Sequence, residues 1–99
     1  MKEFIDKVED FITRRFPKDC NWTQGNCYWF AFILSTQFKS LQIFYDPING
    51  HFLAGNSSYG VYFDWEFTYI NYKDKLLLFE ELKKEDPIWA ARIERDCIN

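Results

Sequence analysis

Four segments of the chain carry apolar residues in patterns typical of helices. In residues 3–16 the apolar side chains recur every three or four positions with charged residues between them, which predicts an amphipathic helix. Residues 27–38 are apolar on nearly every side, which predicts a central, buried helix with Asn26 as its cap. Residues 76–84 and 87–97 also show helical spacing and complete the predicted helices.

Short apolar stretches separated by turn residues predict strands in the middle of the chain. We expect strands over residues 41–46, 51–54 and 61–65, with a fourth short strand near 67–72. An Asn-Gly pair between the first two is the strongest sequence signal for a two-residue hairpin. The chain is therefore predicted to be one α+β domain, residues 1–99. A small antiparallel sheet of three or four strands would pack on the central Cys-bearing helix, with flanking terminal helices.

The composition is that of a globular protein with a single core. The 99 residues are 47% hydrophobic and 21% aromatic, and the net charge is −3. No basic stripe suggests nucleic-acid binding, and no apolar run reaches the length of a membrane span. Since no charged and apolar leader opens the sequence, we expect a cytoplasmic protein.

Three cysteines and one histidine limit the available chemistry. Cys20, Cys27 and Cys97 are an odd set without CxxC spacing, so no metal site and no cofactor are expected. A Cys20–Cys97 bridge is conceivable, but a cytoplasmic setting favours free thiols.

The order of thiol, imidazole and carboxylate along the chain is the main functional signal. Cys27 opens the apolar helix, and His51 and Asp64 follow on two neighbouring predicted strands. A nucleophilic thiol, its general base and the residue that orients the base are distributed in this way in many thiol enzymes. The alternative interpretation of the same residues is a buried core thiol, a histidine beside a turn and a strand carboxylate.

The predicted hairpins allow the site to be examined by strand pairing. If the second hairpin turns symmetrically within its Gly-Asn-Ser-Ser-Tyr-Gly loop, His51 lies directly opposite Asp64. The Asn-Gly turn places His51 opposite Ile48 and puts Asp46 on the same sheet face. Asp64 is therefore the first candidate to orient the imidazole, Asp46 the second and Glu66 the third.

The start of the predicted helix would also support the chemistry of Cys27. Unpaired backbone amides and the helix dipole favour a thiolate and can donate to an oxyanion. Gln24 is a candidate for a second oxyanion donor, and Trp65 would shield the His51–Asp64 contact from water.

The two faces of the predicted sheet differ in polarity, and this leaves assembly of the site open. If the central helix packs on the more apolar face, which His51 does not share, Cys27 would not reach the imidazole. That face comprises Ile43, Tyr45, Phe52, Ala54, Val61, Phe63 and Trp65.

The segment 24–31, Gln-Gly-Asn-Cys-Tyr-Trp-Phe-Ala, resembles the cysteine neighbourhood of papain-like thiol peptidases. The later His and Asp are similar in order to those of papain-like enzymes, bacterial cell-wall amidases and transglutaminase-like enzymes. The resemblance implies a compact papain-like core, with Cys27 as nucleophile, His51 as general base and Asp64 as orienter.

The chain from about residue 20 to its end also resembles small uncharacterised proteins of low-GC Gram-positive bacteria and their phages. The shared features are Asn26-Cys27-Tyr28, Gly50-His51-Phe52, Phe63-Asp64-Trp65, Asp86-Pro87-Ile88-Trp89 and Arg95-Asp96-Cys97.

Two functions are compatible with these patterns. The first is a thiol-dependent hydrolase or acyl transferase of the peptidase, amidase or deamidase type, acting on a small amide or acyl substrate. The second is a non-catalytic, phage-encoded binding protein that retains the papain-like core and inhibits a host enzyme or defence system.

Overall fold

The computed structural model describes residues 1–19, 26–72 and 75–96. Its elements follow in the order α1 (Lys2–Arg15), α2 (Cys27–Gln37), β1 (Gln42–Asp46), β2 (His51–Asn56), β3 (Val61–Phe63), β4 (Thr68–Ile70), β5 (Leu77–Leu78), α3 (Phe79–Glu85) and α4 (Pro87–Asp96). The predicted α+β class is confirmed, with one strand more than expected.

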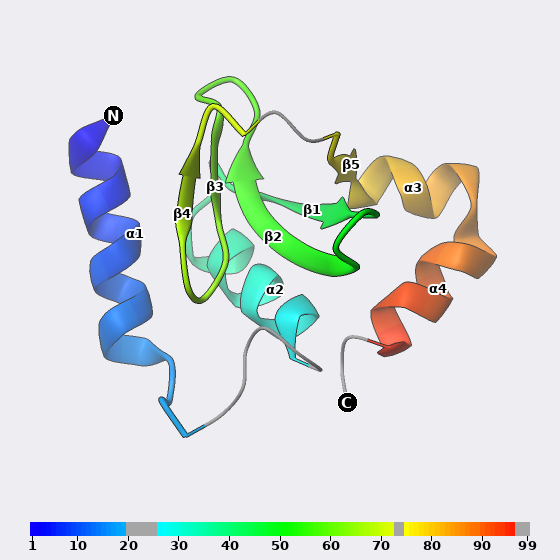
Figure 1. The fold of residues 1–99 in the computed structure, drawn as a ribbon, viewed down its shortest axis with the longest axis horizontal. Helices are drawn as coiled ribbons and strands as arrows, with labels where there is room; N and C mark the ends of the chain where they lie inside the picture. The colour runs from blue at the N-terminus through cyan, green and yellow to red at the C-terminus, as the bar shows by residue number, and fades with distance from the viewer. Residues whose placement is uncertain (20–25, 73–74, 97–99) are drawn as a thin grey trace.

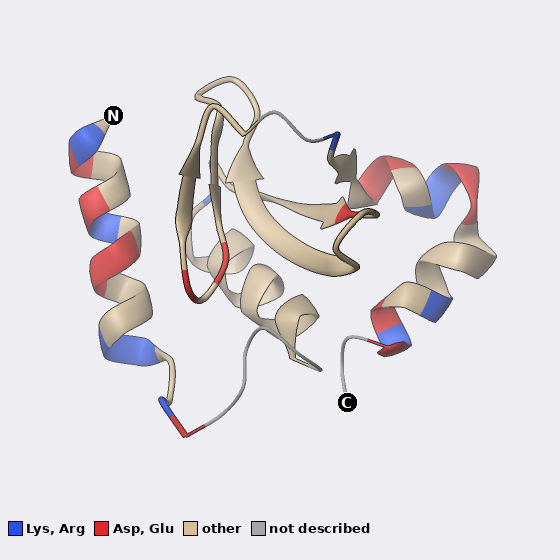
Figure 2. Ribbon diagram, viewed as in Figure 1, with Lys and Arg blue, Asp and Glu red and all other residues tan. Residues whose placement is uncertain are grey.

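The five strands form one antiparallel sheet in the order β4-β3-β2-β1-β5. Figure 1 shows α2 lying across one face of the sheet, α1 beside the β4 edge, and α3 and α4 beyond the β5 edge. Figure 2 shows charged residues along α1, α3 and α4, whereas α2 and most of the sheet carry few. This distribution is expected for a buried central layer with helices at its sides.

The main core lies between α2 and the sheet, because α2 presents an apolar residue at almost every position. Phe30, Ala31 and Leu34 of α2 are buried there. They pack in one cluster with buried residues of the neighbouring strands, namely Tyr45, Phe52, Ala54, Val61 and Phe63. We call this cluster the helix-side core.

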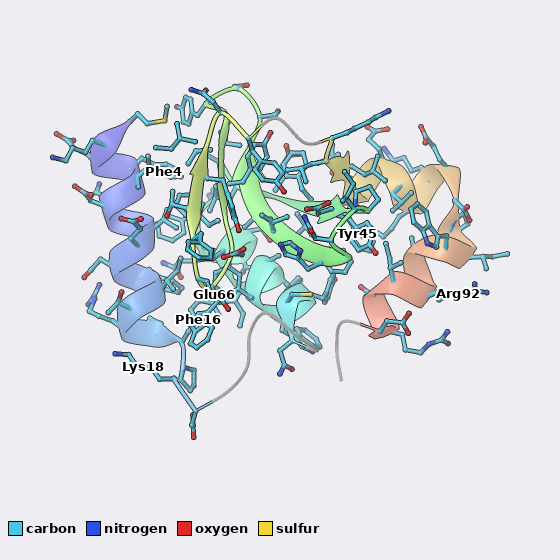
Figure 3. All side chains as sticks on the ribbon, in the orientation of Figure 1. Phe4, Phe16, Lys18, Tyr45, Glu66 and Arg92 are labelled. Atoms are coloured by element: carbon cyan, nitrogen blue, oxygen red, sulfur yellow. The ribbon has the colours of Figure 1, made fainter. Side chains whose placement is uncertain are left out.

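The amphipathic helix α1 is attached to this core by aromatic side chains. Figure 3 shows Phe4 directed from α1 toward the sheet, and its ring lies 6.1 Å from the ring of Phe38 and 6.4 Å from that of Phe63. Phe11 makes a similar edge contact with Phe38 at 5.5 Å. Each such edge-to-face pair adds to the stabilisation from burial itself.

The opposite face of the sheet carries a smaller second cluster built on Phe44, Leu53 and Tyr62. Tyr62 pairs with Gly55 across β2 and β3, and its ring covers that glycine. A Cβ atom at Gly55 would stand 2.1 Å from the tyrosine ring, so this close approach requires glycine. His51 and Leu53 point to the same face because they are two residues apart on β2.

Both predicted hairpin registers are wrong by two residues. Asp46, not Ile48, pairs with His51, and residues 47–50 form the turn. The longer turn is stabilised locally, because Asp46 accepts hydrogen bonds from the backbone N–H groups of Ile48 and Asn49, at 2.9 and 3.2 Å. Gly50 closes it at φ 66°, in the left-handed region.

The second hairpin also has a four-residue turn, and its register is shifted by two residues in the same way. Ala54 pairs with Phe63, which excludes the predicted direct pairing of His51 with Asp64. Residues 57–60 form the turn, and Gly60 ends it at φ 66°. A shift of two residues keeps every side chain on its predicted face, so the expected faces survive the change of register.

The predicted helix over residues 76–84 begins too early. Leu77 and Leu78 pair with Tyr45 and Phe44 of β1 as the short strand β5, and the helix begins at Phe79. The leucines alternate between faces, since Leu77 packs on the helix-side core and Leu78 on the second cluster. A short run of apolar residues is compatible with a helix and with a strand that is buried on both faces. Here the free edge of β1 favours the strand.

Candidate functional site

Within the described ranges, no helix combines the length and the apolar character needed to cross a membrane. The candidate site lies where β2 begins and β3 ends, on and beside the sheet face that carries the second cluster.

Asp64 is the carboxylate that lies beside His51. Its Oδ2 is 3.7 Å from His51 Nε2, an ion-pair distance rather than that of a direct hydrogen bond. Asp64 follows the last residue of β3 and begins a turn, in which its Oδ1 accepts the N–H groups of Glu66 and Phe67 at 2.8 and 2.7 Å. The phenol of Tyr69 donates to Oδ2 at 2.8 Å. The chain therefore bends at Asp64 and brings the carboxylate toward His51 despite the shifted register.

Asp46 lies directly across the β1–β2 ladder from His51 and is fully buried. Besides the two turn N–H groups, it accepts the side-chain amide of Asn49 at 2.7 Å and the hydroxyl of Tyr72 at 3.0 Å. Asp46, the second candidate to orient the imidazole, is thus a turn carboxylate whose oxygens already accept four hydrogen bonds. It lies on the same sheet face as the imidazole.

These neighbours shift the titration of all three groups. Interaction with Asp64 raises the pKa of His51 above its ordinary value, against the smaller opposing effect of burial, and the charges of Asp46 and Cys27 raise it further. Burial by itself would raise the pKa of each carboxyl group, but their hydrogen-bond donors, and His51 in the case of Asp64, hold both values below the ordinary range. The two carboxylates therefore stabilise positive charge on the imidazole when it takes up a proton.

Cys27 is the first residue of α2 and is buried, with 3% of its surface exposed. Its Sγ accepts a hydrogen bond from the backbone N–H of Phe52 at 3.5 Å, and Phe52 directly follows His51 in the chain. α2 packs on the apolar sheet face, the arrangement in which Cys27 was expected not to reach the imidazole. Cys27 nevertheless contacts the backbone next to His51 and contributes to the pKa of its imidazole, because the contact is made at the start of the strand.

The remaining candidates have less direct positions. Gln24 lies outside the described residues. Trp65 is half-buried against the helix-side core and lines, with Ile12 and Phe16, a hollow of about 280 Å³ near the end of α1. Glu66 is exposed and contributes its backbone N–H to Asp64.

Two tyrosines of the site were missed in the sequence. Tyr69 and Tyr72 each donate to one of the two carboxylates, and their rings lie 5.0 Å apart. The register of β4 would have identified Tyr69. Tyr69 pairs with Tyr62 and therefore lies on the sheet face of the second cluster.

Among the described residues, no three His, Cys, Asp or Glu side chains are grouped so that they could hold a metal ion. Comparison of the chain with protein-family models, curated proteins and solved structures finds no match.

Proposed function

We propose that this chain is a thiol-dependent hydrolase or acyl transferase of the peptidase, amidase or deamidase type. Cys27 is the nucleophile, His51 the general base and Asp64 the residue that orients the imidazole. The observation that carries the proposal is the 3.7 Å contact of His51 Nε2 with Asp64, with the Cys27 thiol bound to the next backbone N–H. The papain-like resemblance supports the same three roles.

The reaction begins with transfer of the Cys27 proton to His51. Because Asp64 lies at Nε2, Nδ1 is the nitrogen left to accept it. The thiolate attacks a carbonyl carbon, and the first backbone N–H groups of α2 would stabilise the oxyanion. The imidazolium then protonates the departing amine, leaving a thioester on Cys27. Water or an acceptor amine, deprotonated by His51, attacks the thioester and restores the thiol.

The burial of Cys27 restricts the substrate to small or slender acyl groups. A side chain with 3% exposure does not face a broad cleft. Small amides, thioesters and glutamine side chains reach such a thiol more easily than the backbone of a folded protein does. This favours an amidase, deamidase or acyl transferase over a general peptidase.

The second candidate is a non-catalytic binding protein that inhibits a host enzyme or defence system, of phage origin as the sequence resemblance suggests. One observation favours it: α2 exposes the large apolar residues Trp29, Phe32 and Ile33, at 40%, 42% and 37% of their surface. Exposed apolar groups that lie together are typical of protein-binding surfaces. In this function Cys27 is a core thiol that serine or alanine can replace.

Reaction with an activated ester tests the first candidate against the second. We expect p-nitrophenyl acetate to acetylate Cys27, detected by peptide mass spectrometry, and to be turned over as the thioester hydrolyses. Cys27→Ala should abolish the adduct at this position, and His51→Ala should slow its formation about 100-fold or more. Acetylation of Cys27 that is absent, or that is equally fast without His51, would contradict an enzyme and favour the binding protein.

A further inference from the structure

Building on the thiol chemistry proposed above, we infer that the Cys27–His51 site accepts neutral or positively charged acyl substrates and discriminates against anionic ones. The inference concerns the substrate class of that same site. It is carried by the placement of two buried carboxylates around a single imidazole.

Both carboxylates accept hydrogen bonds from neutral donors, and Asp64 also lies beside His51. Asp46 is 0% and Asp64 8% exposed, and each accepts backbone N–H groups and one tyrosine hydroxyl. These donors stabilise the charge without cancelling it. The local field of each carboxylate therefore persists at the site.

No described lysine or arginine compensates these charges. Every lysine and arginine that the structure describes is exposed, and the ion pair formed by Arg14 is with Asp10 on the surface of α1. His51 lies beside Asp64 and is a cation only when it is protonated. Cys27 and His51 together carry no net charge, whether the proton is on sulfur or on nitrogen, so the four groups sum to −2.

A further carboxylate lies close to the start of α2. Glu94 of α4 interacts with the hydroxyl of Tyr28, the residue next to Cys27, and this pair contributes to a Tyr28 pKa of about 12. Burial of the phenol is the larger cause of that shift.

The expected selectivity is the reverse of what the imidazole alone would produce. An imidazolium beside a thiolate attracts anionic reagents, whereas the two carboxylates outweigh it and repel them. Amides next to lysine or arginine side chains, or to a free amine, fit this field. Acyl donors that carry a carboxylate or phosphate near the reacting carbonyl do not.

Matched methanethiosulfonate reagents test the inference directly. The thiolate attacks the reagent's sulfenyl sulfur, a disulfide forms and methanesulfinate leaves, so the chemistry is the same for each charge. We would measure the rate at Cys27, by mass spectrometry, for the trimethylammonioethyl, methyl and sulfonatoethyl reagents. Each rate is divided by that of 2-mercaptoethanol with the same reagent.

We expect the cationic reagent to exceed the anionic one at Cys27 by about tenfold after this correction, and high salt to reduce the ratio. Asp46→Asn, which keeps an acceptor oxygen for the turn, should lower the ratio by about threefold. The salt dependence of the wild type remains decisive if that variant does not fold.

The outcomes separate this inference from the proposed function. A thiol whose rates depend on His51 but show equal or anionic preference would overturn the selectivity and leave the enzyme standing. Rates at Cys27 that are independent of His51, or absent for all three reagents, would overturn the proposed function and the inference with it.

Discussion

At the scale of single residues, the site is a histidine placed between two carboxylates. Asp64 approaches it from the turn after β3, and Asp46 from the paired position on β1. Each carboxylate also accepts hydrogen bonds in its own turn, so we expect its replacement to affect folding as well as chemistry. The charges of the site and the geometry of the two turns therefore depend on the same two side chains.

The shifted pKa values predict how stability varies with pH. The carboxylates, with lowered pKa values, stabilise the fold above about pH 3.8 and lose this contribution as pH falls through their folded values. His51, with a raised pKa, contributes fully below about pH 6.5 and loses its contribution as pH rises through its folded value. We expect the unfolding free energy to be highest between these limits. Urea titrations across this range measure it.

A matched variant isolates the histidine. In a Cys27→Ala background, so that the thiol does not titrate, His51→Gln should remove the decline above pH 6.5. It should weaken the acid limb without abolishing it, because His51 is one of the groups that lower the pKa of Asp64. An alkaline decline of equal size in both proteins would show that His51 is not its source.

At the scale of elements, β2 organises the molecule. It pairs with β1 and β3, presents Phe52 to α2 and positions His51 at its first residue. The Phe52 ring contacts those of Tyr28, Tyr45 and Phe79 at centroid distances of 5.2, 5.0 and 5.0 Å. This side chain links the helix that bears the thiol to the strand that bears the base.

Truncation of Phe52 tests this role. Phe52→Ala removes a ring with 0% exposure, so we expect a loss of about 3–5 kcal/mol in unfolding free energy. Phe67→Ala is the matched control, because 59% of that side chain is exposed, and its cost should stay within about 0.5 kcal/mol. Chemical denaturation measures both. Equal costs would contradict the assigned core.

The elements also show what sequence patterns can predict. Apolar periodicity identified α1 and α4, because burial on one face imposes a fixed spacing. α2 was identified because it is apolar on nearly every side, and the central strands because short apolar stretches alternate with turn residues. The hairpin registers were wrong because Asp46 and Asn56 accept turn N–H groups through their side chains and so stabilise four-residue turns. β5 was missed because its pairing depends on the free edge of β1, which is a tertiary property.

At the scale of the whole molecule, the site depends on contacts between segments far apart in the chain. Cys27 and Phe52 are 25 residues apart, and the two tyrosines reach the carboxylates from the segment after β3. The three candidate site residues were selected from the sequence by their order and by the predicted strand faces. Their distances, and the roles of the tyrosines, required the arrangement of strand ends around α2.

The central claim is that Cys27 and His51 form a thiolate–imidazolium pair. The most direct test is the pH profile of iodoacetamide labelling at each cysteine, in wild type and in His51→Ala. Burial of Cys27 lowers its labelling rate at every pH. The pH at which labelling rises, and not the absolute rate, therefore reports whether the ion pair forms. Labelling at Cys20 and Cys97 is followed in the same samples.

We predict that Cys27 is labelled well below the ordinary thiol pKa of about 8.5, and that His51→Ala shifts its profile to higher pH. A Cys27 profile centred near 8.5 and unchanged by loss of His51 would contradict it.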